Sequence, residues 1–94
     1  MNYLDYMEIM QAEKLTLPEV GKYTIDEAVR CQKVIKALSN ETNFDMTKQI
    51  KQMEERKIEN ILLAIEWARL AKAEPIAFKW GERLFERATK RDIN

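Results

Sequence analysis

The stretch from residue 46 to residue 73 contains neither glycine nor proline, and it constrains the fold more than any other feature. Its apolar residues recur at spacings of three and four, which is the pattern of an amphipathic helix. Such a helix is about 42 Å long at 1.5 Å per residue. It cannot continue smoothly past Pro75, which has no N–H to donate. The sequence therefore predicts one long helix as the spine of the molecule.

Three further helices are predicted around this spine. The first covers residues 2–14, with Asn2 as its cap and Asp5 in its first turn. Pro18 and Gly21 mark residues 15–23 as the main loop. A second helix is predicted to begin at a capping box formed by Thr24 and Glu27 and to stop near Ser39 and Asn40. The last helix covers residues 76–91, and the caps considered for the long helix are Thr42, Asn43 and Asp45.

Composition agrees with an all-α fold. The chain has 94 residues with only two glycines and two prolines, and 46% of its residues are hydrophobic against 34% charged. This length allows one core and no second domain. We therefore expect a single helical domain over residues 1–94, built as a small antiparallel helical bundle of about four helices with one long central helix.

Charge and cysteine content limit the kinds of partner and the cellular compartment that the sequence predicts. The formal net charge is zero, which argues against a dedicated phosphate binder, although the front half is mildly acidic and the back half mildly basic. These halves are expected to lie against each other. Cys31 is the only cysteine, so an intramolecular disulfide is excluded and a reducing, cytoplasmic location is favoured. Neither a signal peptide nor a membrane span is predicted.

Residues for catalysis are scarce. The chain has no histidine, and its single cysteine makes neither a zinc site nor a redox pair. Gly21 and Gly81 are too few for a phosphate-binding loop. The helical pair Glu54 and Glu55 invites comparison with the all-α nucleotide pyrophosphohydrolases, but the later Glu-x-x-Asp of that family is missing. We expect no enzyme, cofactor, metal or small-molecule substrate, and we interpret Cys31 as a buried residue rather than a reactive thiol.

The first half of the long helix carries only a narrow apolar stripe amid charged residues, whereas residues 58–73 are apolar on most sides and read as central. A straight helix of this length would overhang a compact 94-residue domain, whose radius of gyration is about 12 Å. We therefore predict a protein interface, most simply in a homodimer, that includes two methionines of the first helix: Met46, Ile50, Met53, Met7 and Met10. In the alternative, the first helix folds back and covers the stripe within one chain.

The last helix offers a second candidate surface, because five bases can follow a phosphate backbone along one side: Lys79, Arg83, Arg87, Lys90 and Arg91. Glu82 and Glu86 stand among these bases, which favours a solvated face over a nucleic-acid interface. The aromatic residues at this end of the chain are expected to be core rather than partner anchors: Trp67, Phe78, Trp80 and Phe85. The function that these patterns favour is a regulatory protein–protein interaction module that serves as an adaptor, inhibitor or assembly factor. The alternative is a weak, salt-dependent nucleic-acid binder.

Overall fold

The computed structural model describes the backbone of residues 2–93 and the side chains of residues 2–84 and of Arg87. Helices account for 82% of the chain, and no strand occurs among the described residues. The helices are α1 (Tyr3–Ala12), α2 (Glu19–Ser39), α3 (Thr47–Ala73) and α4 (Pro75–Ile93). The all-α prediction, with four helices of which the third is longest, is confirmed. None of the described helices is both long enough and apolar enough to cross a membrane.

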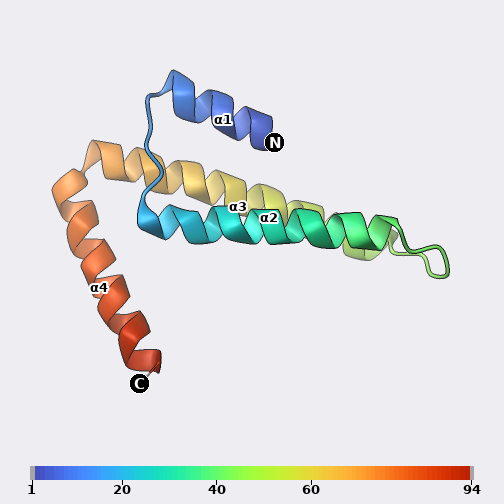
Figure 1. The fold of residues 1–94 in the computed structure, drawn as a ribbon. Helices are drawn as coiled ribbons and strands as arrows, with labels where there is room; N and C mark the ends of the chain where they lie inside the picture. Colours follow the sequence, from blue (N-terminus) through green and yellow to red (C-terminus); the bar gives the residue numbers. More distant parts are fainter. Residues whose placement is uncertain (1, 94) are drawn as a thin grey trace.

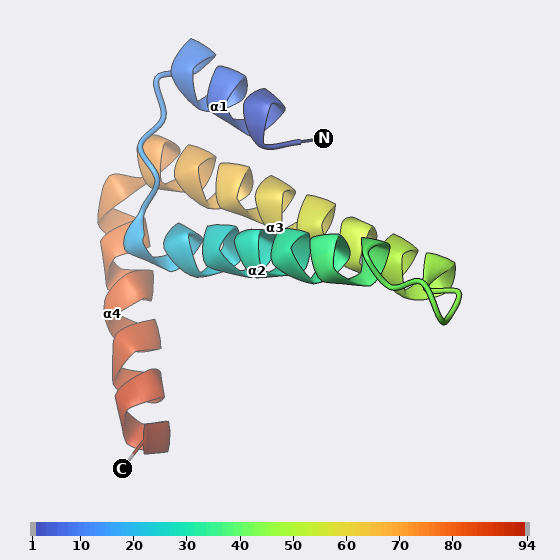
Figure 2. The ribbon, with the colours of Figure 1, turned by 45° about the vertical axis from the view of Figure 1, so that its right-hand side comes forward.

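The centre of the molecule is an antiparallel hairpin of α2 and α3, which pack along their length (Figure 1). In both views α1 lies against the half of this hairpin nearest the α3–α4 junction (Figure 2). The core lies where the three helices meet, and it is formed by Tyr6, Ala28, Ile61, Ala64 and Ile65. Residues 58–73 thus supply three of these five core residues, but the prediction that this half of the helix is surrounded is wrong for one side of it, because Leu62, Leu63 and Leu70 are 44%, 46% and 45% exposed.

The chain is flat and extended. Its principal extents are 52 × 41 × 14 Å and its radius of gyration is 16.1 Å, against about 12 Å for a compact chain of this length. Two features account for this shape: α2 accompanies the long α3, and α4 turns away from the hairpin (Figure 1). The expected overhang of α3 is therefore largely taken up by α2.

The start of α1 is as predicted. The Asn2 side chain accepts the backbone N–H of Asp5 at 2.9 Å, and the Asp5 carboxylate accepts the backbone N–H of Asn2 at 3.0 Å. Each side chain thus satisfies one of the donors that a helix start leaves open. The helix ends at Ala12, and Lys14 beyond it has a positive φ of 53°.

The predicted start of α2 is wrong. The helix begins at Glu19, directly after Pro18, so Thr24 lies inside it and caps nothing. The Thr24 hydroxyl instead donates to the carbonyl of Gly21 at 2.7 Å. Gly21 has no positive φ and is buried within the helix, where an added Cβ would lie 2.6 Å from Leu17 Cδ1. Because Gly21 has no side chain, Leu17 can pack closely against it. The helix begins at Glu19, so the loop predicted over residues 15–23 ends at Pro18.

The bounds of α3 and the break after it agree with the sequence. The N-cap residue is Met46, so none of the three predicted caps occupies that position. Asp45 just before it accepts the hydroxyl and the backbone N–H of Thr47, at 2.6 and 3.0 Å, and these bonds, above all that from the hydroxyl, lower the Asp45 pKa. At the other end Glu74 leaves helical geometry, with φ −137° and ψ 69°. Pro75 then opens α4 at its first position, where a missing N–H costs nothing. This break redirects the chain.

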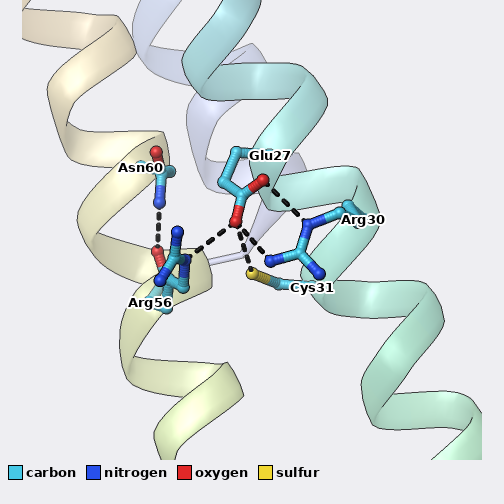
Figure 3. A network of polar contacts seen from close by, with 5 residues as sticks. All are labelled: Glu27, Arg30, Cys31, Arg56 and Asn60. Carbon is cyan, nitrogen blue, oxygen red and sulfur yellow. Dashed lines mark hydrogen bonds and ion pairs between the residues drawn. The ribbon is translucent and has the colours of Figure 1, made fainter.

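A polar cluster joins α2 to α3 at their surface (Figure 3). Glu27 accepts hydrogen bonds from Arg30 on its own helix and from Arg56 on α3, the latter at 2.8 Å. These bonds, above all that from Arg30, lower the Glu27 pKa to about 2. The Cys31 thiol lies 3.9 Å from the same carboxylate and is fully buried, as predicted.

A second ion pair ties the end of α1 to α3. The Arg69 guanidinium donates two bonds to the Glu13 carboxylate, at 2.9 and 2.7 Å, and Lys72 donates to the Glu13 carbonyl. The bond from Arg69 holds the Glu13 pKa below its usual value. In this pair, as in Glu27–Arg56, the front half supplies the acid and the back half the base. The predicted contact between the two halves is confirmed here.

Candidate functional site

The first turns of α4 hold it against α3. Phe78 is buried, and its ring meets that of Trp67 edge-on with centroids 6.0 Å apart. The prediction that these two aromatics are core is confirmed for Phe78, and Trp67 is half-buried beside it. Phe85 lies outside the described side chains. Beyond this contact α4 runs away from the hairpin (Figure 2).

The opposite side of α4 carries a row of large apolar side chains that face solvent. Ile76, Trp80 and Leu84 follow one another at spacings of four and are 76%, 59% and 62% exposed. We call these three residues the α4 stripe. The prediction that Trp80 belongs to the core is wrong, because the core contact of α4 is made by Phe78 on another side of the helix. A row of exposed large side chains is uncommon on a soluble protein and usually marks a contact.

Arg83 is associated with this stripe. Its guanidinium lies over the Trp80 ring, 5.7 Å from the centroid. This cation–π contact orders both side chains while leaving them accessible. A binding partner that covers Trp80 therefore also contacts Arg83.

An apolar groove of about 350 Å³ lies where α4 leaves α3. Its walls combine the start of α2, the end of α3 and the first turns of α4, and are formed by Val20, Trp67, Leu70, Glu74, Ala77, Phe78, Gly81 and Glu82. The two charged residues on these walls are both glutamates, and neither forms an ion pair with a described side chain. The groove is thus apolar with an acidic rim.

Gly81, on the groove wall, has no explanation within the described chain. An added Cβ at this position would meet nothing within 4 Å, and its φ is not positive. A glycine inside a helix costs roughly 1 kcal/mol relative to alanine. From the sequence, Gly81 indicates only that glycines are too few for a phosphate-binding loop. Its position within a predicted helix, next to Trp80, is the feature that marks it as unusual.

The bases predicted to contact nucleic acid are reported where described. Lys79, Arg83 and Arg87 are exposed, and none forms an ion pair with a described side chain. Lys90 and Arg91 lie outside the described side chains. The three described bases lie on the solvent side of α4, as the spacing predicts.

The methionine surface is split by the fold. Met46, Ile50 and Met53 are half-buried at the far end of the hairpin, where α2 runs alongside. Met10 packs against the core and Met7 is 50% exposed, both on α1. The body of α1 lies over the other half of the hairpin (Figure 1), and its start reaches as far as Glu54, with which Asn2 and Asp5 line one pocket. That this stripe forms an interface stays a prediction.

Chemistry-bearing groups are dispersed. Among the described residues, no three acidic or cysteine side chains are grouped so that they could hold a metal ion. Glu54 and Glu55 are exposed on α3. Comparison with protein-family models, curated proteins and solved structures yields no match.

Proposed function

We propose that this chain is a protein-interaction module and that the α4 stripe, together with the adjoining groove, is its docking surface. The observation that carries the proposal is the exposure of Ile76, Trp80 and Leu84 on a helix already anchored by Phe78. Tryptophan and arginine are the residues most enriched at the energetic centres of protein interfaces, and Trp80 and Arg83 lie together here. An amphipathic helix beside an apolar groove is also a recurring mode of recognition.

In this proposal the α4 stripe, and not the apolar stripe of α3, is the main interaction surface. The sequence favours Met46, Ile50 and Met53, but these side chains lie beside α2 and are half-buried, whereas the α4 stripe faces solvent. The class of function is unchanged. Such a module would act as an adaptor, inhibitor or assembly factor, and its buried, unpaired Cys31 suits the reducing cytoplasm.

Site-specific photo-crosslinking in the natural host tests this function. A photoreactive benzoylphenylalanine that replaces Lys79 lies at the edge of the α4 stripe and leaves the three residues of the stripe unchanged. We expect discrete protein adducts from this position. The matched control replaces Glu59, an exposed residue of α3, and should yield none. Equal adducts at both positions, or none at position 79, would contradict the proposal.

A nucleic-acid binder is the second candidate, supported by the exposed bases Lys79, Arg83 and Arg87. This function requires binding that weakens steeply with salt, because each neutralised phosphate releases counterions. Changing Arg83 and Arg87 to Glu should abolish it. An absence of binding by the wild type at low salt would eliminate this candidate.

A further inference from the structure

We propose that the apolar groove where α4 leaves α3 receives a lysine side chain of the binding partner. The inference rests on the proposed function and deepens it, because it names the chemical group that the groove accepts. Its support comes from three features of the groove: the carboxylates on its walls, the aromatic ring beside them, and the apolar character of the remaining walls.

The carboxylates are the first feature. Glu74 and Glu82 line the groove, and they are the charged residues on its walls among those that the structure describes. Neither forms an ion pair with a described side chain. Arg69 and Lys72, the bases in the last turns of α3, are already bonded to Glu13. The groove thus carries two negative charges that the described side chains leave unpaired, and it favours a cationic occupant.

The aromatic ring is the second feature. Trp67 lines the same groove and is half-buried, with Phe78 held edge-on beside it. The face of an indole ring attracts cations, because the ring quadrupole makes that face negative. An ammonium group that enters the groove therefore meets both carboxylates and an aromatic wall, and each of these attracts it.

The rest of the groove accounts for the stem of the occupant. The groove has a volume of about 350 Å³, and its other walls include Val20, Leu70 and Ala77. Lysine carries a compact ammonium on a flexible aliphatic stem, which packs on apolar surface while the charged head keeps polar contacts. An ammonium has three donors to satisfy, whereas the guanidinium of arginine has five. Lysine therefore suits two carboxylates better than arginine does.

Gly81 leaves the side of the groove accessible. It lies on the groove wall, and nothing stands within 4 Å of the position that a Cβ would take. Glycine at such a position allows another backbone to approach closely. The partner segment that carries the lysine can thus lie against α4 at this point.

NMR titration of the purified, ¹⁵N-labelled protein tests the site. The probe is Nα-acetyl-lysine methylamide, and the matched neutral probe is the norleucine derivative, which has the same carbon chain without the ammonium. We expect the Trp67 indole N–H resonance to shift, with an affinity for the lysine probe at least about fivefold higher than for the norleucine probe. Trp80 is an internal control, because it lies on the other side of α4 beneath Arg83, and its indole resonance should not shift.

Paired variants separate local contacts from net charge. Glu74→Gln combined with Glu82→Gln should reduce the affinity for the lysine probe to that for the norleucine probe. Glu55→Gln combined with Glu59→Gln removes two charges from exposed positions of α3 and should bind the lysine probe like the wild type. Circular dichroism should show equal helicity in all variants.

Three results would overturn the inference. They are equal affinity for the two probes, equal shifts of Trp67 and Trp80, and undiminished lysine binding by the Glu74 and Glu82 double variant. The free amine n-butylammonium distinguishes the source of the cation. If it binds and the lysine probe does not, the groove takes a free amine and the assignment to a partner side chain is wrong.

The two proposals fail differently. If the lysine probe does not bind while position 79 still forms protein adducts in the host, the lysine site is wrong and the interaction module stands. If position 79 forms no adduct while the lysine probe binds selectively, the α4 stripe is wrong as a docking surface and the lysine site stands. Failure of both measurements contradicts both proposals.

Discussion

The α2–α3 hairpin and α4 are both amphipathic, but they are covered to different extents: the hairpin buries a core and leaves Leu62, Leu63 and Leu70 about half exposed, whereas α4 buries only Phe78 among its described large apolar side chains. In the hairpin, Ile61, Ala64 and Ile65 are nearly inaccessible, and the Glu27–Arg56 ion pair joins the two helices at the surface. In α4, Phe78 is buried while Ile76, Trp80 and Leu84 face solvent. An amphipathic pattern shows that one face of a helix needs a packing partner. It does not show whether that partner lies in the same chain. Each prediction below tests one side of this contrast.

The largest effect is expected in the hairpin core. Ile61→Ala should lower the free energy of unfolding by about 2–5 kcal/mol, because it removes buried methyl groups and leaves a cavity. Trp80→Ala should cost less than about 1 kcal/mol in dilute monomer, because its ring is already hydrated. Urea denaturation followed by circular dichroism measures both. Similar losses for the two variants would mean that α4 is packed inside the monomer.

The far end of the hairpin gives the next largest effect. Replacing Ile50 and Met53 by Glu should destabilise the fold by about 1–3 kcal/mol, because both side chains are half-buried beside α2. Thermal unfolding and sedimentation of the same variant are compared. A variant with an unchanged melting temperature that loses self-association would instead place the interface at the α3 stripe, as the sequence predicts.

Acid should weaken the hairpin through Glu27. Its pKa is about 2 in the folded chain and 4.5 ordinarily, so its stabilising contribution is complete above pH 4.5 and is lost as the pH falls towards 2. The melting temperature should therefore decrease over this range, with Glu13 acting in the same direction. Glu27→Gln should show a shallower decrease. The control Glu59→Gln should follow the wild type, and an equally steep decrease for Glu27→Gln would remove Glu27 from the account.

The smallest effect distinguishes the two faces of α4. Gly81→Ala should stabilise the dilute monomer by up to about 1 kcal/mol, because alanine favours the helix and its Cβ meets nothing. Urea denaturation at low protein concentration measures this gain. A loss of stability would contradict the open space that surrounds Gly81.

Much of the fold follows from the sequence, for physical reasons that individual residues illustrate. Asn2 and Asp5 cap α1 as their spacing predicts, and Pro75 ends one helix and begins the next. Thr24 and Glu27 have an equally good capping pattern, yet Pro18 starts the helix earlier and Glu27 is used by Arg30 and Arg56. A local pattern cannot reveal such competition from another part of the chain.

The exposure of the α4 stripe is harder to predict for the same reason. The apolar arc of α4 is broad, and the sequence assigns both Phe78 and Trp80 to the core. Only the direction that the chain takes after Glu74 decides that Phe78 meets Trp67 while Trp80 faces solvent. The exposed bases Lys79, Arg83 and Arg87 were predictable because charge and spacing alone place them on the outside.

Hydrogen–deuterium exchange tests the central claim most directly. The backbone of residues 76–84 should exchange faster than that of residues 58–68, because the described side chains of α4 make their buried contact with α3 at Phe78, in its first turns. Protection of residues 76–84 as strong as that of residues 58–68 would contradict the account.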